Sequence, residues 1–278
     1  MKFRGSIVAL VTPFQNGKVD EMKLRDLVDF QIKNKTAGIV PCGTTGESAT
    51  LSHAEHRSVI ELTVRAANKR VPVIAGTGSN STEEAVELTR FAKEAGADAV
   101  LMVSPYYNKP TQKGLYLHFK KVSESVDIPI ILYNIQSRTA VNIEPETMAK
   151  LAQIKNIVGV KEASGNLEQV GRIAALCGKD FTILSGDDAL TLPVMSVGGR
   201  GVISVVANII PNQVENMVEA FENGNMEEAK EMNMRLLPLV KAMFIETNPI
   251  PVKTAMSLMG MISAEFRLPM CGIEEAIA

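Results

Sequence analysis

A chain of 278 residues, 46% apolar and 22% charged, is long enough to bury a large core and matches a single α/β barrel in length. Its 29 Lys and Arg residues nearly balance 31 Asp and Glu residues, and no cationic run is present, which excludes the charge pattern of a nucleic-acid binder. The sequence shows neither an apolar stretch of about 18 residues nor a signal-peptide pattern, so we expect a cytoplasmic protein with a small-molecule partner and no membrane contact.

Short β-branched runs alternate along the chain with segments of helical periodicity, the pattern of parallel-sheet proteins. We predict helices between the strands, among them Leu24–Lys33, Glu83–Ala95 and Pro145–Gln153. The near-continuous apolar strands indicate a sheet covered on both faces, and their number favours an α/β fold of the (β/α)8 TIM barrel type. The predicted strands are Ser6–Val11, Gly38–Pro41, Val71–Ala75, Ala99–Val103, Ile128–Tyr133, Ile157–Lys161, Thr182–Ser185 and Val202–Val205.

The chain continues past the last predicted strand with three helical segments, Gln213–Glu222, Met226–Phe244 and Val252–Met259. A barrel needs one helix there, so we predict a catalytic barrel over residues 1–224 and a small helical extension over residues 225–278, packed on the barrel. A last helix is expected to begin after Gly272.

Three helices carry the spacing of a capping box, in which a capping side chain precedes Glu or Gln by three positions. The pairs are Ser52 with Glu55, Ser81 with Glu84, and Asn166 with Gln169. These helix starts fix the loops before them, and in a barrel the chemistry lies on the loops after the carboxyl ends of the strands.

Lys161 ends the sixth predicted strand, in the stretch NIVGVKEASGN. It shares a face with Gly159, which we expect to leave room beneath the lysine. A desolvated lysine loses its proton more readily and can attack a carbonyl to form a Schiff base. The alternative is a structural lysine, paired with Glu162 or extended to the rim, and position alone does not separate the two.

Two further polar residues follow the fifth predicted strand. Tyr133 ends that strand, where a phenol near an imine can relay protons, or the ring can simply be buried and hydrogen-bonded. Arg138 lies in the next loop, where a guanidinium can grip a carboxylate or remain a solvated surface charge.

Glycine-rich loops follow other strands without completing a nucleotide motif. CGTTGES (42–48) offers hydroxyl and backbone N–H groups for a small anion but lacks the Gly-Lys-Ser/Thr of a Walker loop. In GTGSNS (76–81), Ser81 stands where a dinucleotide fingerprint needs glycine. We therefore predict no nucleotide site.

Neither the histidines nor the cysteines form a metal-binding pattern. His53 and His56 are three apart on a predicted helix but lack a third ligand in view. Cys42, Cys177 and Cys271 are odd in number and far apart, so we expect thiols rather than a disulfide framework or a zinc site.

Taken together, these motifs resemble the pyruvate-dependent class I aldolase superfamily, to which N-acetylneuraminate lyase belongs. Each motif is weak alone, and their order and spacing carry the resemblance from Gly5 to about Pro269. They are GTTGE (43–47), VIAGTG (73–78), PYYN (105–108), Tyr133 with Arg138, GVKEASGN (159–166), LSGDD (184–188), GVISV (201–205) and NPIPVK (248–253).

The resemblance is strongest to members that condense pyruvate with L-aspartate 4-semialdehyde in lysine and diaminopimelate biosynthesis. It implies an imine between Lys161 and pyruvate, no metal and no other cofactor. It also implies a proton relay and a set of substrate-binding residues. The relay is Tyr133, Thr44 and Tyr107, with Tyr107 supplied by a neighbouring subunit of a dimer of dimers; substrate binding falls to Thr45, Arg138, Ile203 and Gly186.

Feedback-sensitive members of this group bind L-lysine at the subunit interface, so the resemblance also implies a regulatory site. The matching positions are Ser48, Ala49, His53, His56, Asn80, Glu84 and Tyr106. Two other positions depart from the usual pattern, because Gln136 and Ala140 replace a proline and a glycine in the Arg138 loop. That loop is expected to be differently shaped or looser.

Two competing functions remain. A sister aldolase, such as N-acetylneuraminate lyase or a 2-keto-3-deoxy sugar acid aldolase, would share the lysine and tyrosine but needs polyol contacts. A non-catalytic binding protein with the same fold would have lost one of Lys161, Tyr133, Thr44 or Arg138, and all four are present.

Overall fold

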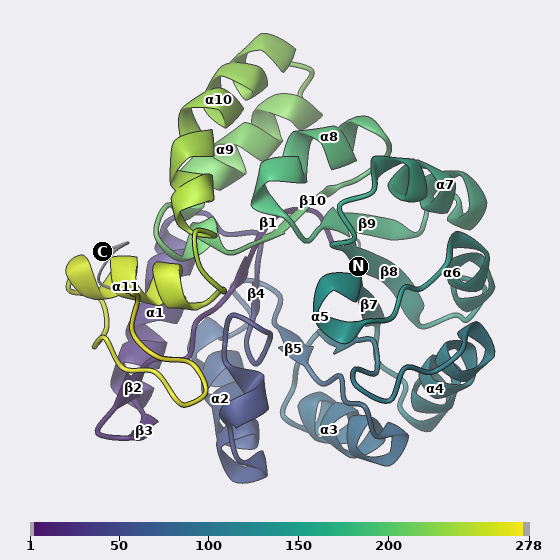
Figure 1. Ribbon diagram of the computed structural model, residues 1–278, viewed down its shortest axis with the longest axis horizontal. Helices are drawn as coiled ribbons and strands as arrows, with labels where there is room; N and C mark the ends of the chain where they lie inside the picture. Colours follow the sequence, from purple (N-terminus) through teal and green to yellow (C-terminus); the bar gives the residue numbers. More distant parts are fainter. Residues whose placement is uncertain (1–2, 275–278) are drawn as a thin grey trace. The chain divides into compact units, whose positions relative to one another are not determined.

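The computed structural model describes residues 3–274 and confirms the predicted α/β class of parallel strands alternating with helices (Figure 1). The main sheet has the strand order β4-β1-β10-β9-β8-β7-β6-β5, with eight strands, as the barrel prediction requires. These strands are β1 (Gly5–Ala9), β4 (Gly38–Val40), β5 (Ile74–Gly76), β6 (Ala99–Val103), β7 (Ile130–Asn134), β8 (Ile157–Glu162), β9 (Thr182–Ser185) and β10 (Gly201–Ser204).

The chain divides into two compact units. The first unit holds Ile74–Ile203 with the residues up to Gly5, and the second holds Ser6–Val73 with the residues from Ser204 onward. Within the described residues, neither unit has a helix that meets the length and apolarity needed to cross a bilayer.

In the first unit, consecutive parallel strands β5 to β9 are each followed by helical structure. Figure 1 shows α3, α4, α6 and α7 along the outer side of these strands. The strands are apolar and almost fully buried, as expected for a parallel sheet covered on both faces. The helical elements are α3 (Thr82–Glu94), α4 (Gln112–Ser125), α5 (Gln136–Thr139), α6 (Pro145–Leu151), α7 (Leu167–Cys177), η2 (Asp188–Leu190) and α8 (Thr191–Ser196).

The second unit contains the parallel pair of β1 and β4 and an antiparallel hairpin of β2 (Phe14–Gln15) and β3 (Lys18–Val19). Helix α1 packs on α2, and α9 packs on α10. Its helical elements are α1 (Glu21–Lys33), η1 (Ser48–Thr50), α2 (His53–Ala67), η3 (Val206–Asn208), α9 (Pro211–Glu222), α10 (Met226–Ala242) and α11 (Ile250–Leu258).

All eight predicted strands are present, and two of them begin later than predicted for one reason. β5 begins at Ile74 rather than Val71, and β7 at Ile130 rather than Ile128. Pro72 and Pro129 precede these starts, and proline has no N–H to donate to a sheet ladder. The β2–β3 hairpin and α5 were not predicted.

The domain division at residue 224 stays a prediction. We expected a helix after Gly272. The described residues there, up to Glu274, are not helical, and the rest of that segment lies outside the described residues.

Of the three predicted capping boxes, the one of Ser52 and Glu55 is complete. In the other two, the capping oxygen accepts from the expected backbone N–H, but the second side chain turns elsewhere. The Glu84 carboxylate bonds to the Ser79 hydroxyl, and the Gln169 amide bonds to Asn142. Both side chains therefore form hydrogen bonds away from the start of their own helix, in the polar clusters described below.

His118 of α4 is a buried polar group in the first unit, 6% exposed. Its Nδ1 lies 2.9 Å from the Thr82 hydroxyl of α3, and its ring packs edge-on against Phe119. Burial lowers the pKa of His118 to about 4. The neutral ring therefore contributes stability that is present above the ordinary histidine pKa of about 6.5 and is lost as the pH falls toward about 4.

His118→Gln is expected to make the pH dependence of stability shallower. Because the unfolded chain binds a proton in this window and the folded chain resists it, the wild type should lose about 2 kcal/mol more than the variant between pH 7 and pH 5. Chemical denaturation at the two pH values measures the difference. An equal pH slope for His118→Gln and the wild type would contradict the assignment.

Candidate active site

Lys161 and Tyr133 lie side by side at the carboxyl ends of β8 and β7. They are register partners across this parallel pair, and the Lys161 Nζ lies 4.3 Å from the centroid of the Tyr133 ring. Each residue is 5% exposed. Loss of hydration is costly for an ammonium group, and the face of an aromatic ring offsets part of that cost. The structure therefore brings together the predicted amine and phenol in the first unit.

Gly186, just after β9, is the glycine that borders the lysine side chain. A Cβ there would lie 3.1 Å from Lys161 Cε and 2.6 Å from the Ala163 Cβ. The role expected of Gly159 is different, because a Cβ at Gly159 would come within 2.4 Å of the Thr182 carbonyl oxygen of the neighbouring strand. Gly159 thus permits strand packing, and Gly186 leaves the space that Lys161 occupies.

Glu162, the alternative partner of Lys161, has other hydrogen-bond donors. Its carboxylate accepts from the Ser164 N–H at 2.8 Å, the Asn134 side chain at 3.1 Å and the Gln169 side chain at 3.4 Å. Successive strand residues point to opposite faces, so these neutral donors satisfy Glu162 away from the lysine. The buried Lys161 amine is not neutralised by its neighbour in sequence.

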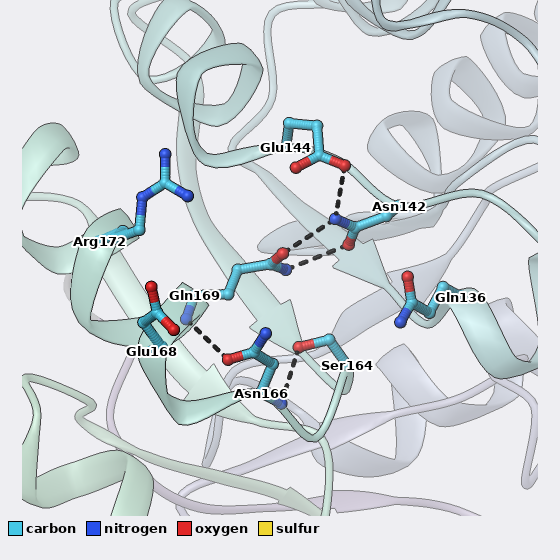
Figure 2. Close-up of a pocket in the computed structure, with 8 residues that line it drawn as sticks. All are labelled: Gln136, Asn142, Glu144, Ser164, Asn166, Glu168, Gln169 and Arg172. Carbon is cyan, nitrogen blue, oxygen red and sulfur yellow. Dashed lines mark hydrogen bonds between the residues drawn. The ribbon is translucent and has the colours of Figure 1, made fainter.

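Figure 2 shows a polar cavity of about 280 Å³ whose lining includes part of this network. Asn142 and Gln169 exchange two hydrogen bonds across it, at 2.9 and 3.1 Å, and Asn142 also donates to Glu144. The lining residues are Gln136, Asn142, Glu144, Ser164, Asn166, Glu168, Gln169 and Arg172. None of these residues is a predicted catalytic or substrate-binding residue.

Arg138 lies on α5, the short helix that replaces the expected loop, and its side chain is exposed. The helix ends at Ala140, which has the left-handed φ of 58°. In this conformation the Cβ crowds the following carbonyl at a cost of roughly 1–2 kcal/mol. The departure noted at Ala140 therefore falls on a position where glycine would be unstrained.

In the second unit, the Thr44–Thr45 loop follows β4 and is held by distant side chains. Thr45 is 2% exposed, and its hydroxyl accepts a hydrogen bond from the Asn248 side chain at 3.0 Å. The Gly46 carbonyl accepts from the Thr12 hydroxyl at 2.6 Å, and Thr44 is half-buried. The loop is thus fixed by partners that the sequence motif does not contain.

Glu47 ends this loop in a buried ion pair with Lys253 of α11. The Lys253 Nζ lies 2.5 Å from a Glu47 oxygen, and the two side chains are 0% and 2% exposed. The same Nζ donates to the Glu265 carbonyl at 2.8 Å and lies 4.4 Å from the centroid of the Phe14 ring. Burial lowers the pKa of Lys253, and the charge of Glu47 opposes that effect. Removing either partner would leave an uncompensated buried charge.

Tyr106 and Tyr107 follow β6 with different exposures, 39% and 89%. Tyr107 has a left-handed φ of 71°. Burial raises the pKa of Tyr106, and the negative charge of Glu84 adds to the effect. The Asn108 side chain donates to the Asn80 carbonyl at 2.9 Å. Three predicted regulatory residues, Asn80, Glu84 and Tyr106, therefore belong to one polar neighbourhood of the first unit.

The other four predicted regulatory residues lie in the second unit, at the start of α2 and in η1 before it. Ser48 and Ala49 are in η1, His53 is the first residue of α2, and His56 is 7% exposed one turn further on. Ile203, predicted to bind pyruvate through its backbone, is fully buried on β10 of the first unit.

The cysteines are free, as predicted, and differ in exposure. Burial raises the pKa of the Cys42 thiol strongly and that of Cys177 to about 11, while Cys271 is exposed. Across residues 3–274, no three His, Cys, Asp or Glu side chains are grouped closely enough to hold a metal ion.

A (β/α)8 barrel with a buried lysine beside a tyrosine at neighbouring strand ends has the parts of a Schiff-base-forming enzyme. The model of the Dihydrodipicolinate synthetase family matches residues 2–278. The 4-hydroxy-tetrahydrodipicolinate synthase of Syntrophus aciditrophicus (strain SB) is 62% identical over 273 residues, 98% of this chain and 94% of that protein. The chain belongs to the dihydrodipicolinate synthetase family, and it is a lyase of the class I aldolase type.

Solved structures agree with this assignment. The dihydrodipicolinate synthase of Aquifex aeolicus is 52% identical with a TM-score of 0.98, covering 99% of this chain and 94% of that one. The enzyme of Acinetobacter baumannii, solved complexed with pyruvate, is 45% identical with a TM-score of 0.97, covering 99% and 95%. That of Cyanidioschyzon merolae, solved with lysine bound, is 44% identical with a TM-score of 0.96, covering 99% and 94%. These names support the synthase and not the sister aldolases.

Ala140→Gly is expected to raise the free energy of unfolding by about 1 kcal/mol, because glycine adopts the left-handed conformation without crowding. Ala152, which ends α6 with a φ of -64°, is the matched control. Ala152→Gly should lower stability by about 0.5–1 kcal/mol through backbone entropy. Denaturant titration measures both, and equal destabilisation by the two glycines would refute strain at Ala140.

Proposed function

We propose that Lys161 forms the Schiff base through which this chain carries out the 4-hydroxy-tetrahydrodipicolinate synthase reaction. The observation that carries the proposal is the buried Lys161 amine against the Tyr133 ring. The neutral amine attacks the pyruvate carbonyl, and water leaves as the imine forms. Loss of a methyl proton gives an enamine, whose carbon attacks the aldehyde of L-aspartate 4-semialdehyde. The amino group of the product then closes onto the imine carbon and frees Lys161.

The remaining predicted residues take the roles that this sequence of steps requires. Tyr133, Thr44 and Tyr107 pass protons, and the exposure of Tyr107 makes its phenol available to a neighbouring subunit. Pyruvate is assigned to Thr45, the backbone of Ile203 and Gly186. Arg138 on α5 takes the carboxylate of the semialdehyde through paired N–H groups.

The imine itself withdraws electrons from the reacting carbon, so the proposal requires no metal and no organic cofactor. A role for Tyr107 across an interface requires at least a dimer, and we propose the dimer of dimers that the sequence led us to expect. The cytoplasmic location and the division of the chain at residue 224 stay predictions.

Lys161→Ala is expected to reduce the condensation rate at least about 1,000-fold, because no other group supplies the covalent intermediate. The assay follows product formation from pyruvate and L-aspartate 4-semialdehyde. Lys179→Ala, at an exposed lysine, is the control with wild-type activity. Substantial activity in a folded Lys161→Ala protein would rule out the Schiff-base route.

We also propose that L-lysine inhibits the enzyme through the predicted regulatory residues. Glu84 supports this proposal, because, in addition to burial, its negative charge raises the pKa of Tyr106, and its carboxylate accepts a hydrogen bond from the Ser79 hydroxyl rather than from its own helix cap. A carboxylate at this position suits an ammonium group, and the Tyr106 phenol suits a polar ligand beside it.

Glu84→Gln is expected to weaken inhibition by L-lysine at least about tenfold, since the charge that holds the ligand is lost. Inhibition curves at saturating substrates measure the effect. Glu83→Gln, the exposed neighbour on the same helix, should keep wild-type sensitivity. Wild-type activity that is unchanged at millimolar L-lysine would reject the proposal.

A further inference from the structure

We propose that Asn248 is a positioning residue that orients the Thr45 hydroxyl to donate to the pyruvate carboxylate, an inference that rests on the proposed role of Thr45. The two residues are 203 positions apart in sequence, yet the Asn248 Nδ2 lies 3.0 Å from the Thr45 Oγ. They are 7% and 2% exposed. Because both residues are shielded from water, no solvent molecule competes for the hydrogen bond that Asn248 donates to the Thr45 hydroxyl.

The chemistry of the two groups fixes where the hydroxyl hydrogen goes. The amide NH2 of Asn248 can only donate, so it occupies a lone pair of the Thr45 oxygen. The hydrogen of that oxygen therefore points away from Asn248 and is available to another acceptor. A carboxylate is a strong acceptor for such a hydrogen, because the bond is charge-assisted.

The loop that carries Thr45 is fixed by contacts near Thr45, so movement of the loop cannot carry the hydroxyl away from its partner. Glu47, two residues after Thr45, is bound by Lys253 of α11, and Asn248 lies just before that helix. The rings of Phe14 and Phe266 lie 4.4 and 5.1 Å from the Lys253 nitrogen. The segment from Asn248 to Lys253 therefore binds the loop at Thr45 and at Glu47.

Arg267 also binds this loop and the segment that follows it. Its backbone N–H donates to Glu47 at 3.3 Å, and its guanidinium donates to the Thr50 carbonyl at 3.1 Å and to Glu55 at 2.5 and 2.8 Å. Arg267 lowers the pKa of Glu55 to about 2, so this pair is charged across the working range. Asn248 acts within this frame, since it is the side chain that reaches Thr45 itself.

Asn248→Asp tests the direction of the bond. An ionised aspartate only accepts, so the Thr45 hydroxyl must turn its hydrogen toward Asp and away from pyruvate. The pyruvate KM should rise about tenfold with kcat within about twofold of the wild type. Asn248→Ala leaves the hydrogen free and should raise the pyruvate KM only about two- to threefold. A merely structural role predicts the opposite order, because Asp keeps the shape of Asn.

A double-mutant cycle with Thr45→Val tests whether Asn248 acts through this hydroxyl. Once the hydroxyl is gone, Asn248→Asp should add no further increase to the pyruvate KM. Thr254→Val in α11 is the control, because its hydroxyl bonds locally to the Ile250 carbonyl at 2.9 Å, and it should leave the pyruvate KM unchanged. Additive effects in the cycle, or a milder effect of Asp than of Ala, would overturn the proposal.

Borohydride trapping of pyruvate separates this inference from the proposed function. If the wild type is not trapped at Lys161, the proposed function fails and the role of Asn248 falls with it. If the wild type is trapped and Asn248→Asp shows the same dependence on pyruvate concentration, only the positioning role is overturned. If thermal melting shows that Asn248→Asp does not fold, the cycle of Asn248→Ala with Thr45→Val is used instead. Non-additive effects on the pyruvate KM are then expected, and additive effects would contradict the proposal.

Discussion

The site depends first on the burial of one amine at the end of β8. Lys161 reaches its position because Gly186 has no side chain there, and its nitrogen faces the ring of Tyr133 across a parallel register. The nearest carboxylate in sequence, Glu162, is satisfied by neutral amide donors. In the proposed mechanism, this amine is the group that reacts with the pyruvate carbonyl.

A second constraint acts on the threonine loop after β4. Two residues of the last part of the chain, Asn248 and Lys253, bind Thr45 and Glu47 of that loop. The buried ion pair does not by itself imply high stability, because desolvation offsets much of its attraction. The main effect of this ion pair is on the conformation of the loop, because it holds Glu47 in one position. The residues after the last strand thus hold the threonine loop in place as well as adding to the core.

Much of this could be predicted from local pattern. Strand alternation located Lys161 and Tyr133 on neighbouring strands, and spacing located the cap of α2. Prolines shifted the starts of β5 and β7 because a missing N–H does not change hydrophobic periodicity. The partners of Thr45 and Lys161 were missed for a different reason. Asn248 and Gly186 are distant in sequence, and only the packed structure shows which glycine or amide meets which side chain.

The site of covalent attachment of pyruvate tests the role of Lys161 most directly. Wild-type protein is treated with labelled pyruvate and borohydride, digested, and its peptides are mapped by mass spectrometry. Label is expected on Lys161 alone, and it is expected to be lost when L-aspartate 4-semialdehyde turns the imine over before reduction. Label on another lysine, or none at saturating pyruvate, would contradict the assignment of Lys161 as the residue that forms the Schiff base.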